Sequence, residues 1–70
     1  MYRNLIATMS YKGVTNEMIA DLLNVHRNTV YNKIHRGEFT FGEAYKVSET
    51  YFPEYKPSYL FKRVEEKAAS

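Results

Sequence analysis

The apolar residues of this chain come in short runs at helical spacing, and the early runs end at residues that accept a left-handed backbone. The first run, within residues 2–12, contains Tyr2, Leu5, Ile6 and Met9. Gly13 follows it, and Asn24 and Gly37 occupy similar places after later runs. No segment alternates cleanly between apolar and polar residues, as a half-buried strand would. The pattern therefore predicts an all-α protein built from short helices joined by tight turns.

Further helices follow from apolar spacing and capping residues. Thr15 can accept the free amides of a second helix, and a third helix is predicted over residues 27–35. The Thr-Phe-Gly-Glu capping box at residues 40–43 starts a fourth, and Ser58 is expected to cap a last helix over residues 58–67. The residues expected to face the core from these helices are Met18, Ile19, Leu22, Leu23, Val30, Ile34, Phe41, Ala44, Tyr45, Val47, Tyr51, Leu60, Phe61 and Val64.

The composition fits one small globular domain. The chain has 70 residues, 44% hydrophobic and 26% charged, so residues 1–70 are expected to form a single domain in which residues 68–70 are disordered. It has no cysteine, which excludes a disulfide framework and a thiolate zinc site and suits a reducing cytosol. There is no signal-peptide pattern, and no run approaches the ~18 apolar residues of a membrane span. The net charge of +2 does not by itself indicate a polyanionic partner.

The stretch NVHRNTVYNKI, residues 24–34, joins the second predicted helix to the third. Val30 and Ile34 lie four positions apart, so they share a face that can pack on the second helix. The opposite face begins with Arg27 and Asn28, and Tyr31 follows one turn later. Two helices joined in this way form a helix-turn-helix, whose second helix enters the DNA major groove. Arg can contact guanine and Asn can contact adenine, and each bidentate contact discriminates by about 1–3 kcal/mol.

The stretch VTNEMIADLLNVHRNTVYNKIHRGEFTFGEAYKV resembles the DNA-binding domain of phage repressors and Cro proteins, the lambda-repressor-like (Cro/C1-type, XRE) superfamily. The matching positions are Thr15, Ile19, Ala20, Val25, Val30, Ile34, Gly37, Phe39 and residues 40–43. With the closing segment YFPEYKPSYLF, the resemblance extends from about residue 2 to residue 64. It implies a compact five-helix bundle with a helix-turn-helix formed by helices 2 and 3. It also implies a transcription regulator of phage or prophage type that works in the bacterial cytoplasm or nucleoid.

The resemblance also assigns roles to individual residues. It places Arg27, Asn28 and Tyr31 where the family reads bases of a double-stranded DNA operator. The residues that it places at or near the phosphate backbone are Thr15, Asn16, His26, Asn32, Lys33, Arg36 and Thr40.

Three positions depart from the family pattern. Asn24 replaces the usual turn Gly, a mild change because Asn tolerates the left-handed region. Met18 stands where an acid or Gln would complete the cap with Thr15, so that cap is expected to be half made. His26 replaces a favoured capping residue before the third helix, so it is expected to face a phosphate, and the start of that helix is left open.

A single recognition helix covers few base pairs. Members of the family therefore usually bind DNA as two-fold dimers, on half-sites about 34–36 Å apart. The candidate dimer surface is Tyr51, Phe52, Tyr59, Leu60 and Phe61. An equal alternative is that these residues pack inside the protein and complete its hydrophobic core. Nothing resembles the self-cleaving domain of longer repressors, which favours control by concentration or by a regulatory protein partner.

Other functions stay open. The polar face of the third helix could be merely solvated, or the chain could be a protein-binding module of the same fold, such as an antirepressor. The protein-binding hypothesis stays open because three acidic residues lie close to the proposed DNA face: Glu17, Asp21 and Glu38. A recombination or packaging accessory protein would also bind DNA. The seven tyrosines could stack on single strands, although core packing accounts for several of them.

The sequence does not predict an enzyme, a cofactor or a metal site. There is no Ser-His-Asp arrangement in a recognisable context and no Gly-rich phosphate loop. His26 and His35 lie nine positions apart and lack a third ligand nearby, so a metal site is not expected.

Overall fold

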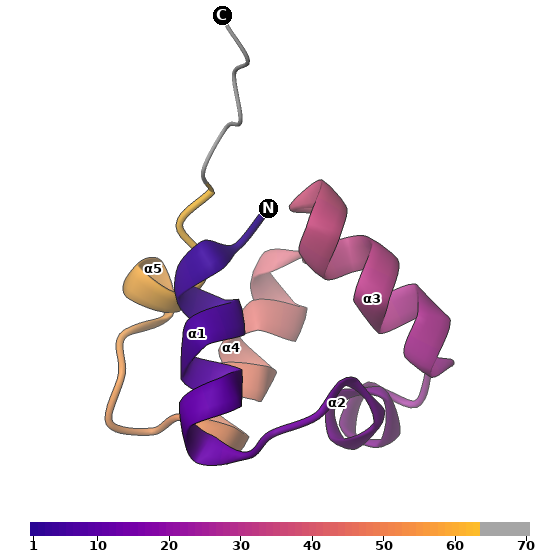
Figure 1. The fold of residues 1–70 in the computed structure, drawn as a ribbon, viewed down its shortest axis with the longest axis horizontal. Coiled ribbons are helices and arrows are strands. Elements are labelled where there is room, and N and C mark those ends of the chain that lie inside the picture. Colours follow the sequence, from indigo (N-terminus) through magenta and orange to yellow (C-terminus); the bar gives the residue numbers. More distant parts are fainter. Residues whose placement is uncertain (64–70) are drawn as a thin grey trace, which may run out of the picture.

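The computed structural model describes residues 1–63, and all the regular structure in that part of the chain is helical (Figure 1). The helices are α1 (Arg3–Lys12), α2 (Asn16–Leu23), α3 (Arg27–Arg36), α4 (Phe41–Tyr51) and α5 (Pro57–Leu60). The predicted all-α class is therefore confirmed for the described residues. Helix α2 packs on α3 and α4, and α5 packs on α1 and α4. Helices α3 and α5 lie at opposite ends of the long axis of the molecule (Figure 1).

The three predicted left-handed positions end the first three helices. Gly13 has φ +73°, Asn24 has φ +59° and Gly37 has φ +69°. Asn24 keeps the turn between α2 and α3 tight, because its amide and that of Val25 donate to carbonyls of the last turn of α2. Only residues 24–26 therefore connect α2 to α3.

The cap of α2 is more complete than the sequence predicts. The Thr15 hydroxyl accepts from the Met18 amide at 3.2 Å, as expected of an N-cap. The Thr15 amide in turn donates to the Met18 sulfur at 3.4 Å. The prediction of a half-made cap was wrong because a thioether sulfur is a weak acceptor that can take the place of a carboxylate.

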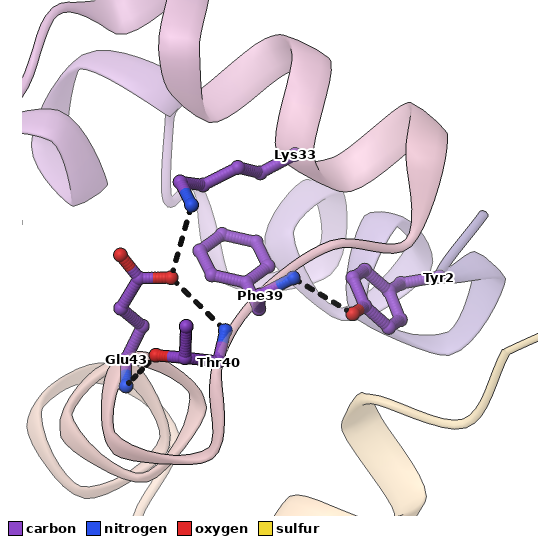
Figure 2. Close-up of polar contacts among 5 residues, drawn as sticks. All are labelled: Tyr2, Lys33, Phe39, Thr40 and Glu43. Atoms are coloured by element: carbon purple, nitrogen blue, oxygen red, sulfur yellow. Dashed lines mark hydrogen bonds and ion pairs between the residues drawn. The ribbon is translucent and has the colours of Figure 1, made fainter.

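The core joins residues from every helix and from the loop before α4. Its buried hydrophobic residues are Tyr2, Leu5, Met9, Val14, Ile19, Ala20, Val30, Ile34, Phe39, Ala44, Val47, Phe52 and Leu60. Tyr2 has a polar role as well, because its hydroxyl accepts a hydrogen bond from the buried Phe39 amide at 3.0 Å (Figure 2). Phe61 packs edge-on against both rings, so the two ends of the described chain meet over the segment that leads into α4.

Two residues expected in the core are on the surface. Phe41 is 84% exposed and Tyr45 is 50% exposed, although Ala44 and Val47 of the same helix are buried as predicted. The reason is the length of the covering helix, since α5 has 4 residues against 11 in α4. A four-residue helix cannot cover the whole of that side of α4.

The last helix differs from its prediction. It begins at Pro57 with Lys56 as its N-cap, and Ser58 lies inside it rather than at its cap. Proline suits this first helical position because it has no amide to leave unsatisfied and its φ is already helical. Leu60 is buried and Phe61 half-buried, in agreement with the predicted inward face. The prediction of one helix from Ser58 to Lys67 was wrong, because the helix ends at Leu60 and residues 61–63 are not helical. The expectations for Val64 and for disorder at residues 68–70 lie outside the described residues.

Among residues 1–63, no helix is long and apolar enough to cross a membrane.

Candidate functional site

Helix α3 is held by one face and leaves the other open. Val30 is fully buried and Ile34 is 2% exposed, and both belong to the same core as Ile19 of α2. Val25, in the turn, is half-buried against that core. The predicted anchoring of α3 through Val30 and Ile34 is therefore confirmed, and α3 can present its other side to a partner.

The open side of α3 is a continuous polar face. We call the α3 face the exposed residues Arg27, Asn28, Tyr31, Asn32, His35 and Arg36. Their spacing of one, three and four positions places them on one side of the helix. All three predicted base-reading residues belong to this face, and so do two of the predicted phosphate contacts, Asn32 and Arg36.

His26 caps α3 directly. Its Nδ1 accepts a hydrogen bond from the Asn28 amide at 3.1 Å, and α3 begins at the next residue, Arg27. An acceptor nitrogen carries no proton, so this hydrogen bond assigns the ring proton to Nε2. His26 is not a favoured capping residue, so the sequence did not predict this cap. Its imidazole nevertheless reaches the second amide of the helix, as an Asn or Asp side chain does. The Nε2–H of this exposed side chain keeps its capacity to donate.

His35 lies on the α3 face, although the sequence did not predict it as a site residue. Its ring packs on that of Tyr31, with centroids 4.2 Å apart and planes inclined by 41°. The spacing of four positions was the available signal, because residues i and i+4 of a helix are neighbours. Tyr31 is 52% exposed, so His35 supports one side of a ring whose other side is open.

Lys33 and Thr40 are engaged in the joint between α3 and α4. The Lys33 ammonium lies 3.2 Å from Glu43 Oε1, and that oxygen also accepts from the Thr40 amide at 3.0 Å (Figure 2). The Thr40 hydroxyl accepts from the Glu43 amide at 3.2 Å, which completes the predicted capping box. Figure 2 shows the Lys33 side chain directed toward Glu43. Both residues were predicted to contact phosphate, and each already has a partner within the fold.

The charges at this joint set the protonation of Glu43. Partial burial of the carboxylate acts to raise its pKa, but the hydrogen bond from the Thr40 amide and the interaction with Lys33 outweigh burial. The net pKa lies below the ordinary value, so Glu43 is ionised at neutral pH. The joint therefore holds a charged pair between α3 and α4.

A shallow hollow beside the start of α3 combines both signs of charge. It is lined by Glu17, Ala20, Asp21, Val25, His26 and Arg27. The two carboxylates come from α2, and they lie alongside the first residues of the α3 face. They reduce the positive field at the place where Arg27 projects.

The other predicted site residues are placed as follows. Thr15 is the N-cap of α2, and Asn16 is its first, half-buried residue. In the candidate dimer surface, Phe52 and Leu60 are fully buried, so closure of the core is the role that the structure gives them. Tyr51 and Phe61 are half-buried, and Tyr59 is 49% exposed. Within residues 1–63, no group of three or more His, Asp or Glu residues could hold a metal ion.

Comparison of the chain with protein-family models, with curated proteins and with solved structures finds no match. The geometry of the α3 face and its supports is therefore the basis for a functional proposal.

Proposed function

We propose that this chain is a sequence-specific, double-stranded DNA-binding transcription regulator, a Cro-like protein or minimal repressor of the lambda-repressor-like type. One observation carries the proposal. Helix α3 is anchored by Val30 and Ile34 and leaves Arg27, Asn28 and Tyr31 exposed on its first two turns. In a helix-turn-helix, this is the part of the second helix that meets the base edges.

Bases would be read by the first half of the α3 face. The Arg27 guanidinium can donate two hydrogen bonds to guanine, and the Asn28 amide can pair with adenine. The Tyr31 ring, supported by His35, offers an apolar surface to a thymine methyl group. The His26 cap fixes the position of Arg27 and Asn28, because its acceptor holds the Asn28 amide.

Phosphates would be contacted around these base readers. The groups that can donate to phosphate are the side chains of Asn32 and Arg36 on the α3 face, the side chain of Asn16 at the start of α2, and the Nε2–H of His26. Lys33 would contribute chiefly through its charge, since its ammonium is paired with Glu43. The phosphate layer positions the domain and makes binding depend on salt.

The test is selection of bound duplexes from a randomised DNA pool, followed by fluorescence-anisotropy titration of the selected sequence at ~50 mM salt, where phosphate contacts are strong. Wild type is expected to enrich a defined motif, and the Arg27→Ala/Asn28→Ala variant is expected to lose that enrichment. Each lost bidentate contact should weaken binding by about 1–3 kcal/mol. Lys46→Ala is the matched control, because it removes one exposed positive charge from α4 and should leave the motif unchanged.

Absence of duplex binding by wild type at low salt would refute this function. The second candidate would then be a protein-binding module of the same fold. The observation that favours it is the pair of carboxylates, Glu17 and Asp21, beside His26 and Arg27. A mixed-charge surface of this kind suits a protein partner with both signs of charge, and its binding would not need DNA.

A further inference from the structure

The cap of α3 depends on the charge of one side chain. His26 Nδ1 accepts the hydrogen bond from the Asn28 amide at 3.1 Å, so this nitrogen must keep its lone pair. A second proton on the ring would bind to Nδ1 and turn it into a donor. Two N–H groups would then face each other at the start of α3. The cap therefore exists only in the neutral form of His26.

A protonated His26 would also stand among positive charges. The amino end of a helix carries a partial positive charge, and Arg27 is the next residue of the chain. The position that suits a neutral imidazole therefore repels an imidazolium. Because the His26 side chain is exposed, its ring can rotate away from the helix end without leaving a cavity in the core.

Two carboxylates lie beside the ring. Glu17 and Asp21 belong to α2 and line the same hollow as His26 and Arg27. They are four positions apart, so they occupy one side of α2. Within residues 1–63, neither carboxylate forms an ion pair with another side chain. The hollow therefore offers a protonated His26 the negative partners that the end of α3 lacks.

We propose that His26 is a proton-operated switch at the start of α3. In the neutral form, its ring caps α3 through Nδ1. When Nδ1 takes a proton from solvent, the ring leaves the cap and pairs with Glu17 or Asp21. Histidine side chains change charge between about pH 5 and 8, whereas aspartate and glutamate ordinarily stay ionised over most of that range. The exchange of partners therefore takes place near neutral pH.

The switch would regulate the base readers, and this consequence rests on the proposed DNA-binding function. Arg27 and Asn28 are the first two residues of α3, so release of the cap loosens the turn that presents them. Sequence-specific binding should then weaken at acidic pH. Non-specific binding should not weaken, because the added positive charge favours phosphates. A falling ratio of specific to non-specific affinity therefore distinguishes the switch from a general electrostatic effect.

The switch itself is tested without DNA, by NMR titration of the full chain from about pH 8 to about pH 5. Long-range nitrogen–proton spectra report which ring nitrogen carries the proton, and the Asn28 amide resonance reports the cap. In wild type the neutral ring should carry its proton on Nε2, and the Asn28 amide should shift with the same midpoint as the His26 ring. His26→Asn provides a cap that does not take up a proton, so its Asn28 amide should not shift in this range.

The carboxylates are tested by removing one charge at a time. Glu17→Gln and Asp21→Asn should each lower the pH at which the His26 ring titrates, because the protonated ring loses a negative partner. Glu38→Gln is the matched control, since it removes an exposed carboxylate just beyond the other end of α3 and should leave the midpoint unchanged. An Asn28 amide that does not follow the ring, or a Glu38→Gln shift as large as the other two, would overturn the proposal.

The DNA arm compares wild type with His26→Asn on the selected duplex and on a random duplex. Between about pH 7.5 and about pH 5.5, the ratio of specific to non-specific affinity should fall about fivefold in wild type, the effect of one lost N-cap. It should stay constant in His26→Asn. Both proteins keep His35, so its titration cancels in the comparison. An equal fall in both proteins would overturn the regulation by His26. If wild type binds no duplex, the DNA-binding function fails, whereas the NMR titration still decides the switch.

Discussion

At the scale of single residues, two side chains act as helix caps in ways that standard preferences do not favour. Met18 offers a sulfur to the Thr15 amide, and His26 offers Nδ1 to the Asn28 amide. Both satisfy amides that would otherwise lack a partner at the start of a helix. The cap at His26 has the larger consequence for function, because the next two residues are the proposed base readers.

Replacement of His26 should show the value of its cap. His26→Ala removes the acceptor, and we expect a loss of about 1 kcal/mol in the free energy of unfolding, as for other lost N-caps. His26→Asn restores a side-chain acceptor and should be as stable as wild type or slightly more stable. Urea denaturation of the three proteins measures the difference. Equal stability of the Ala and Asn variants would show that the His26 hydrogen bond contributes nothing.

At the scale of elements, α3 packs mainly on α2, and an ion pair joins it to α4. The Lys33–Glu43 ion pair joins the two helices, and the two hydrogen bonds between Thr40 and Glu43 hold the carboxylate in place at the cap of α4 (Figure 2). The ammonium and the carboxylate are both mostly shielded from solvent, with side chains 23% and 26% exposed. A pair of this kind is screened less by salt than a fully exposed one.

The joint makes stability depend on pH. The pKa of Glu43 is lowered in the folded state, so its contribution is fully present above the unfolded value near 4.5 and is lost as the pH falls through the lower folded pKa. Glu43→Gln keeps a side-chain oxygen for the Thr40 amide but has no charge. Wild type should therefore exceed Glu43→Gln by about 0.2–1 kcal/mol at pH 7, and the gap should close toward pH 3. Chemical denaturation at several pH values measures it, and a gap that widens in acid would contradict this assignment.

At the scale of the whole molecule, Tyr2 connects the beginning of the chain to the segment before α4. Its ring is 2% exposed, its hydroxyl accepts from the buried Phe39 amide, and its own amide donates to the Ile34 carbonyl. These contacts connect α1, the end of α3 and the start of α4. They hold the last turn of α3 through the Ile34 carbonyl, while the side chains of Val30 and Ile34 anchor the helix in the core.

Loss of one oxygen atom should therefore destabilise the whole fold. Tyr2→Phe leaves the buried Phe39 amide without an acceptor, and we expect a loss of about 1–3 kcal/mol. In a domain of this size, each kcal/mol lowers Tm by about 4–8 °C. Tyr11→Phe is the control, because the Tyr11 side chain is 84% exposed and should change Tm little. Thermal melts followed by circular dichroism compare the two, and similar Tm values for both variants would contradict the role given to Tyr2.

The helices and their ends at the turns follow from local signals in the sequence. Apolar spacing and the residues Gly13, Asn24 and Gly37 predicted where three of the helices end, because these signals act within a few neighbouring residues. The buried face of α3 also followed from Val30 and Ile34, since a helix has a fixed period. The same period placed Arg27, Asn28 and Tyr31 on the open side of α3.

Contacts between side chains of different elements depend instead on tertiary packing. Three examples are the exposure of Phe41, the burial of Phe52 and the pairing of Lys33 with Glu43. These depend on how far α5 extends and on how α3 meets α4. Helical spacing shows which residues share a face, but it does not show what covers that face. The cover comes from residues distant in the sequence, so packing determined the core, the Lys33–Glu43 pair and the exposed residues of α4.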